Sequence, residues 1–163
     1  MNLTGQNIIG FGKSSEGTVA VQATNPVTGD TLGPLFYNAT TEELASATEL
    51  AEDAFKIYRK KSGKEKALFL RKIAEEIEAI AEVLTDRFTS ETGLPEGRAN
   101  GERGRTCGQL RLFAGLLEEG SWVNAKIDPA MPDRSPLPRV DIRSMERPLG
   151  PVAVFGASNF PLA

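Results

Sequence analysis

Apolar and polar residues alternate over two short stretches near the start of the chain, and this pattern predicts a β-hairpin. The first strand is expected over residues 18–24 and the returning strand over residues 31–37. Residues 25–30 between them contain a proline, which fixes φ, and Gly29, which can adopt the positive φ that a tight turn requires. Residues 1–17 are polar and glycine-rich, and we expect them to form a flexible N-terminal arm.

After the hairpin, apolar residues recur at steps of three and four, and this period predicts three helices. The first is expected to begin at the capping-box pair Thr40 and Glu43, and the second at the same signature in Ser62 and Glu65. The third is expected over about residues 96–117. The apolar stripes comprise Leu44, Ala47, Ala51, Ala54 and Tyr58 in the first helix, Leu70, Ile73, Ile77, Ile80, Leu84 and Phe88 in the second, and Leu110, Phe113, Ala114 and Leu117 in the third. We expect the three helices to pack together through these stripes.

The pattern changes after the hairpin and helical layer, which together span residues 18–123. Prolines crowd into residues 124–138, which predicts an extended crossing segment. Residues 139–147 alternate and predict a strand. Residues 148–163 are expected to open a βα unit, in which the continuously apolar residues 152–155 form a strand buried on both faces. Such a strand needs neighbours on both edges, so the predicted fold class is α/β, with only the first strand of a Rossmann-like sheet present.

The composition is that of an ordinary globular protein, with 40% hydrophobic residues, 25% charged residues and a net charge of −3. No basic run is long enough to follow a phosphate backbone, so nucleic acid is not an expected partner. The absence of histidine excludes His-based triads and His-ligated metals within these residues, and no metal is expected. No apolar run approaches the ~20 residues of a membrane span, and the start shows no signal peptide. A cytoplasmic protein without membrane association is therefore expected.

Five segments of the chain, taken in order, resemble the aldehyde dehydrogenase superfamily. They are Asn-Pro-Val-Thr-Gly at 25–29, Glu-Thr-Gly-Leu-Pro at 91–95, Arg-Leu-Phe-Ala-Gly at 111–115, Arg-Pro-Leu-Gly-Pro-Val-Ala at 147–153 and Asn-Phe-Pro-Leu at 159–162. The resemblance covers residues 18–163. It implies an enzyme that oxidises a small-molecule aldehyde with NAD or NADP, and an α/β fold of which this chain supplies the N-terminal portion.

Two stretches narrow the resemblance to one branch. Most members of the superfamily have Pro-Trp before Asn-Phe-Pro, whereas residues 155–163 read Phe-Gly-Ala-Ser-Asn-Phe-Pro-Leu-Ala. Together with residues 104–111, this variant resembles the α-ketoglutaric semialdehyde (2,5-dioxopentanoate) dehydrogenases. That branch oxidises its aldehyde to 2-oxoglutarate and commonly uses NADP.

The resemblance implies roles for the loop that precedes Asn-Phe-Pro and for its asparagine. The side-chain amide of Asn159 would donate to the oxyanion that forms when a thiolate attacks the aldehyde. The alternative is a helix N-cap, a position that asparagine also fills well. Phe155, Gly156, Ala157 and Ser158 match the loop that passes the ribose and nicotinamide of the cofactor, and the alternative for them is a plain strand-to-helix turn.

The resemblance also places Arg105 on the helix that walls the substrate tunnel. A guanidinium there could hold the distal carboxylate of a dicarboxylic semialdehyde by a bidentate pair, with Phe160 as a second substrate-binding residue. The alternative is a solvent-facing arginine in a basic stretch, whose other members are Arg98, Arg103 and Arg111.

The strand at residues 139–147 matches the one that builds the oligomerisation sheet in the family, so a homo-oligomer formed through this strand is expected. A non-catalytic oligomerisation or interaction module derived from the family is the alternative function.

Cys107 falls in a helix at a position that the family does not use for catalysis, and a buried, inert thiol is expected there. The resemblance places the catalytic cysteine and glutamate beyond residue 163.

We expect the isolated 163-residue chain to oxidise no aldehyde with NAD or NADP, because the nucleophile and the general base of the family fall outside it. The absorbance of the reduced cofactor measures this. Turnover by the purified chain would contradict the expectation, and Cys107→Ser would then show whether the only cysteine had been misassigned.

Overall fold

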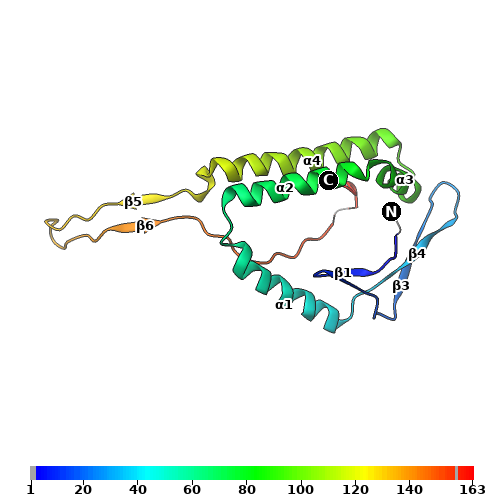
Figure 1. The fold of residues 1–163 in the computed structure, drawn as a ribbon, viewed down its shortest axis with the longest axis horizontal. Coiled ribbons are helices and arrows are strands. Elements are labelled where there is room, and N and C mark those ends of the chain that lie inside the picture. Colours follow the sequence, from blue (N-terminus) through cyan, green and yellow to red (C-terminus); the bar gives the residue numbers. More distant parts are fainter. Residues whose placement is uncertain (1–2, 157) are drawn as a thin grey trace.

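The computed structural model describes residues 3–156 and 158–163, and its elements form an open arrangement rather than one closed globule (Figure 1). In chain order the elements are β1 (Asn7–Ile9), β2 (Gly12–Ser14), β3 (Ala20–Thr24), β4 (Thr31–Tyr37), α1 (Thr41–Tyr58), α2 (Gly63–Ala79), α3 (Ala81–Thr92), α4 (Glu96–Glu119), a 3₁₀ turn (Ser121–Val123), β5 (Lys126–Asp128) and β6 (Ile142–Ser144). Within the described residues the strands pair only as three separate antiparallel hairpins.

The antiparallel pair α2 and α4 contains most of the buried residues, and α2 lies along the C-terminal part of the longer α4 (Figure 1). The residues that meet there are small: Ala67 and Ala74 on α2, with Cys107 and Ala114 on α4, are all at most 1% exposed. Small side chains allow the two backbones to approach closely. The thiol of Cys107 donates to the carbonyl oxygen of Ala74 at 3.7 Å, which confirms the expected buried cysteine.

Two partly exposed ion pairs link α2 and α4 beside this contact. Arg71 Nη2 lies 2.6 Å from Glu118 Oε2. Arg111 donates to both oxygens of Glu78, at 2.7 and 2.6 Å, in a bidentate pair. The hydrogen bond from Arg111 lowers the pKa of Glu78 below its ordinary value, so this pair stays charged at neutral pH.

Both predicted capping boxes are present at the helix starts. The Thr40 hydroxyl accepts from the Glu43 amide at 3.1 Å, and Glu43 Oε2 accepts from the Thr40 amide at 2.8 Å. Ser62 and Glu65 repeat the arrangement at α2. The hydrogen bond from the Ser62 backbone, followed by that from Lys61, lowers the pKa of Glu65 to about 2. These reciprocal bonds satisfy amides that have no partner inside the helix.

The expected single second helix is wrong, because α2 ends at Ala79 and α3 begins at Ala81. Ile80 between them leaves helical geometry, with φ −102° and ψ 19°. The apolar stripe continues through the break at the same steps of three and four, so periodicity could not reveal it. As a result, α3 turns away and packs against the first half of α4, with Phe88 buried.

The predicted hairpin over residues 18–37 is confirmed as β3 and β4, with Gly29 at φ 81° in the turn. The flexible arm expected over residues 1–17 instead contains the hairpin β1–β2. A Cβ on Gly5 would lie 1.7 Å from the carbonyl oxygen of Leu35, and one on Gly17 would lie equally close to that of Asn38. Only glycine allows this close approach, so the segment packs against β4.

Most of the apolar stripe of α1 does not pack against the other helices, contrary to expectation. The exception is Tyr58 at its end, whose ring centre lies 6.0 Å from that of Phe69 in α2 in an edge-on contact. Leu44 is 63% exposed, and Ala51 and Ala54 are also exposed. Figure 1 shows the reason: α1 diverges from the α2–α4 pair, and among the described elements it meets mainly β1. Apart from Tyr58, its stripe is therefore largely exposed.

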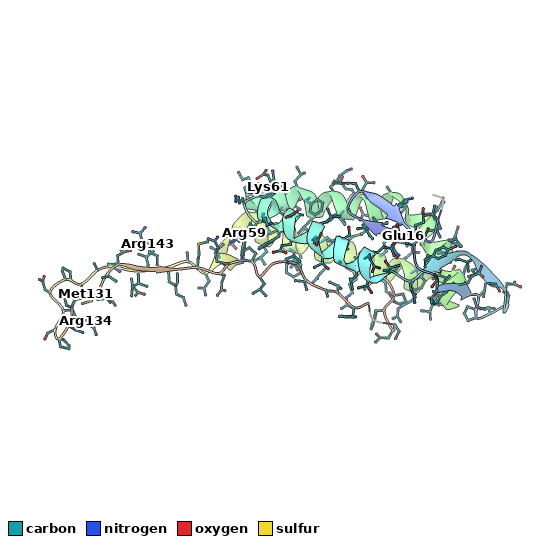
Figure 2. All side chains as sticks on the ribbon, turned by 90° about the horizontal axis from the view of Figure 1, so that it is seen from below. Glu16, Arg59, Lys61, Met131, Arg134 and Arg143 are labelled. Carbon is teal, nitrogen blue, oxygen red and sulfur yellow. The ribbon has the colours of Figure 1, made fainter. Side chains whose placement is uncertain are left out.

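The Pro-rich residues 124–138 were expected to cross the molecule, but they form one half of a projecting two-stranded arm, with β5 paired to β6 (Figure 2). The predicted strand over residues 139–147 is real but shorter, because only Ile142–Ser144 pair. Near the tip, Met131 and Arg139 exchange backbone hydrogen bonds of 2.8 and 3.0 Å. The arm is long and narrow, and its outer edges have no strand beside them among the described residues.

The strand expected at residues 152–155 is absent, and this expectation is wrong for the chain as it stands. Val154 is 86% exposed and Phe155 is 92% exposed. A parallel strand needs partners on both edges, and the described residues offer none. The whole chain exposes 11997 Å², against about 7,900 Å² for a compact protein of 17.6 kDa. Much apolar surface is therefore available for burial against other structure.

Because α2 and α4 approach each other closely, we expect a larger side chain between them to lower the free energy of unfolding. Ala74→Leu should lower the free energy of unfolding by about 1–3 kcal/mol, because the added atoms must separate the two helices. Ala79→Leu, at an exposed position of the same helix, should change it by less than about 0.5 kcal/mol. Urea unfolding followed by circular dichroism measures both, and equal effects would contradict the packing described.

Candidate substrate site

A cavity of about 710 Å³ lies between one face of α4 and the C-terminal segment. Its volume is within the ~300–1,000 Å³ typical of small-molecule sites. The side chains that matter for the argument are Arg105, Gln109 and Phe113 from α4, and Phe155, Gly156 and Phe160 from the C-terminal segment. The walls are mainly apolar, and their polar side chains are one arginine, one amide and the hydroxyl group of Thr106.

The Asn-Phe-Pro-Leu segment, residues 159–162, is attached to α4 by hydrogen bonds. Arg98 Nη2 donates to the carbonyl oxygen of Asn159 at 2.9 Å. Glu102 Oε2 accepts from the amide of Leu162 at 3.0 Å, and the Thr106 hydroxyl donates to the carbonyl oxygen of the same leucine. Arg98, Glu102 and Thr106 follow one another at four-residue steps, so one face of α4 supplies all three contacts.

Two cations lie near the ring of Phe160. The guanidinium of Arg98 is 4.6 Å from the centre of the ring, and that of Arg105 is 5.4 Å from it. Both distances are within the range of cation–π attraction. Phe160 therefore contacts both arginines, and it lines the cavity together with Arg105.

The four arginines of α4 differ in their partners. Arg98 Nε lies 2.5 Å from Glu102 Oε1, Arg111 binds Glu78, and Arg103 donates to the Thr85 hydroxyl at 2.9 Å. Among the residues that the structure describes, Arg105 alone of the four has no hydrogen-bonded partner, and it lines the cavity. Arg105 is exposed, as the alternative of a solvent-facing arginine expects, but the other three arginines of α4 are each held by a hydrogen-bonded partner.

Glu102 is an anion in a largely buried position, 4% exposed. Burial raises the pKa of Glu102, but the hydrogen bonds from the Leu162 amide and from Arg98 outweigh it, together with the charges of Arg98 and Arg105. The pKa therefore lies below the ordinary value of a glutamate. Because Glu102 and Arg98 neutralise each other, the guanidinium of Arg105 is the net charge at this wall.

The model of the Aldehyde dehydrogenase family matches residues 12–163, which is most of the chain. The chain belongs to the aldehyde dehydrogenase family. It is 48% identical to an alpha-ketoglutaric semialdehyde dehydrogenase 2 of Azospirillum brasilense over its full length, and 43% identical over 98% of its length to an alpha-ketoglutaric semialdehyde dehydrogenase of Acinetobacter baylyi. The chain spans 31% and 30% of the length of these two relatives.

Solved aldehyde dehydrogenases have the same arrangement of elements. A succinate-semialdehyde dehydrogenase of Burkholderia pseudomallei matches 78% of this chain with a TM-score of 0.67 and 30% identity, and the chain covers 26% of that protein. An NAD-dependent benzaldehyde dehydrogenase of Corynebacterium glutamicum matches 82% of this chain with a TM-score of 0.70 and 18% identity. This chain covers 28% of that protein. The latter similarity shows the fold alone.

The structure brings only some of the predicted aldehyde dehydrogenase site residues together. Phe155, Gly156 and Phe160 line the cavity with Arg105, whereas Ser158 does not belong to its lining. Ala157, predicted with the same loop, lies outside the described residues.

Asn159 is exposed beside the cavity rather than in its lining, and its carbonyl group is fixed by Arg98. In the described part of the chain no hydrogen bond reaches its side-chain amide. Residues 160–163 form one turn, in which the Ala163 amide donates to the Phe160 carbonyl oxygen at 3.2 Å. The alternative role as an N-cap thus has no helix to cap in this structure.

Sequence reasoning missed Arg98, Glu102 and Thr106 as part of this site. Their four-residue spacing on the face that also carries Arg105 was a usable signal, since i, i+4 pairs of opposite charge are neighbours on a helix. Their partners, however, are about 60 residues away along the chain. No local pattern shows that residues 159–162 return to α4.

The described residues fit only part of a dinucleotide site. Gly156 has open space on its Cβ side, so a cofactor could pass close to the backbone there. A pyrophosphate crevice needs adjacent parallel strands, and the strands in the described residues are all antiparallel.

The described residues contain no group of acidic, cysteine or histidine side chains suited to a metal. None of their helices is long and apolar enough to cross a membrane.

Proposed function

We propose that this chain forms the substrate-facing helical layer of an NAD(P)-dependent aldehyde dehydrogenase that oxidises a dicarboxylic semialdehyde, such as α-ketoglutaric semialdehyde, to the acid. The observation that carries the proposal is the placement of Arg105, which lines the cavity without a hydrogen-bonded partner among the described residues. Two relatives that span the chain are named for α-ketoglutaric semialdehyde, which supports the same substrate class.

Arg105 suits the distal carboxylate of such a substrate. A guanidinium presents paired N–H donors that match the two oxygens of a carboxylate, and this pairing is strong in a partly apolar wall. Phe160 limits the orientations open to the guanidinium, and Gln109 adds an amide one turn further along α4. The apolar side chains of Phe113 and Phe155 would contact the carbon chain of the substrate.

Asn159 suits the other end of the substrate. Its amide can donate to the oxygen of the reacting aldehyde without titrating, so it stabilises the negative charge that develops there. NAD(P), when bound, accepts the hydride from the aldehyde carbon. We place the thiolate nucleophile and the general base outside these 163 residues, because Cys107 is buried between helices. The described residues therefore bind and orient the substrate.

We further propose that the β5–β6 arm joins copies of the protein into a homo-oligomer. The arm projects from the body, and Val140 and Ile142 are exposed along it. Exposed strand edges of this kind pair readily with other strands. The arm alone would also suit a non-catalytic interaction module, but such a module gives no reason for the cavity and for Arg105.

The role of Arg105 predicts a substrate-dependent defect. In the dehydrogenase at its natural length, Arg105→Met should lower kcat/KM for a semialdehyde that carries a carboxylate by about 10- to 100-fold, because a charge-assisted pair is lost. An unsubstituted aldehyde of the same length should be affected little. Arg103→Met, which removes a guanidinium bonded to Thr85, is the matched control. Equal losses for the two aldehydes would contradict the proposal.

The role of Asn159 predicts a defect that does not depend on the substrate. Asn159→Ala should lower kcat by about 10²–10³-fold for both aldehydes, because the oxyanion donor is lost in either case. Steady-state kinetics with the two substrates measure it. An unchanged kcat with a raised KM would assign Asn159 to binding instead.

A further inference from the structure

Glu102 is a buried carboxylate that the proposed reaction does not use directly. It lies on α4 one turn after Arg98 and is 4% exposed. A buried carboxylate destabilises a fold unless charged or hydrogen-bonding partners surround it. Of the two partners that Glu102 has among the described residues, one belongs to residues 159–162 and the other binds them.

These contacts hold the Asn-Phe-Pro-Leu segment at both ends. Arg98 binds Glu102 Oε1 through Nε at 2.5 Å and the carbonyl oxygen of Asn159 through Nη2 at 2.9 Å. The other carboxylate oxygen of Glu102 accepts from the Leu162 amide at 3.0 Å, and Thr106 binds the carbonyl group of that leucine. The carboxylate of Glu102 therefore acts at both ends of the segment. It binds the guanidinium that donates to Asn159, and it accepts directly from the Leu162 amide.

We propose that Glu102 and Arg98 are positioning residues for Asn159, which hold residues 159–162 against α4 so that the side-chain amide of Asn159 stays at the reacting oxygen. This inference rests on the proposed function of Asn159. Neither side chain lines the 710 Å³ cavity, so both act through the segment rather than on the substrate. A donor that moves by about 1 Å loses much of its effect on rate.

The test is Glu102→Gln in the dehydrogenase at its natural length. Glutamine keeps the size of the side chain and an acceptor for the Leu162 amide, but it removes the charge that aims Arg98. We expect kcat to fall by about 10- to 100-fold with little change in KM, because Arg105 and the cavity walls still bind the substrate. Arg98→Gln, at a half-exposed position, should give the same loss.

A double-mutant cycle with Asn159→Ala separates positioning from general stability. If Glu102 acts through Asn159, adding Glu102→Gln to Asn159→Ala should cause no further loss of kcat. If the two losses multiply, Glu102 has a separate role and the inference is wrong. Hydrogen exchange at the Leu162 amide should also be faster in the Glu102→Ala variant, which removes the acceptor; unchanged exchange would contradict the attachment.

Glu118→Gln is the matched control, because Glu118 also forms an ion pair from α4, with Arg71 at 2.6 Å, but faces α2. It should leave kcat unchanged, and a loss as large as that of Glu102→Gln would overturn the inference.

The oxyanion role of Asn159 and the positioning role of Glu102 can fail separately. If Asn159→Ala itself leaves kcat unchanged, the oxyanion role fails and the positioning role fails with it. If Asn159→Ala lowers kcat but Glu102→Gln does not, only the positioning role fails.

Discussion

The close packing of α2 against α4 determines where the other parts of this chain can lie. Alanines and Cys107 at the contact let the two backbones approach, and the ion pair between Arg111 and Glu78 links the same two helices at the surface. With one face of α4 buried against α2, a second face carries Arg98, Glu102 and Arg105 toward the C-terminal segment. The cavity therefore depends on small residues on the opposite side of the same helix.

Outside the packed pair of helices, the chain leaves a large apolar surface exposed. Most of the α1 stripe and the residues around Phe155 are exposed among the described residues, and the total exposed area exceeds that of a compact protein of this mass by about half. Aldehyde dehydrogenases that match this chain are about three times as long. The helical layer is thus locally well packed but presents a wide apolar surface for further structure.

Local features were predictable from the sequence, and features that need distant partners were not. The capping boxes at Thr40 and Ser62 and the turn at Gly29 each depend on a few neighbouring residues, and the structure contains all of them. The break at Ile80 was hidden because the apolar period continues through it. The strand expected at residues 152–155 needs partner strands, and the attachment of residues 159–162 to α4 joins segments about 60 residues apart. The family resemblance pointed to α4 as a candidate substrate wall, but only the structure distinguished Arg105 from the three other arginines of α4, which are hydrogen-bonded.

The most direct test of the account is a crystal structure of the dehydrogenase at its natural length with a bound dicarboxylate product. We expect the distal carboxylate to lie about 2.7–2.9 Å from the guanidinium nitrogens of Arg105. We also expect the side-chain amide of Asn159 to lie about 2.7–3.1 Å from an oxygen of the newly formed carboxylate. A product bound away from α4, or one that binds in the cavity with neither contact, would contradict the assignment of this chain as the substrate-facing wall.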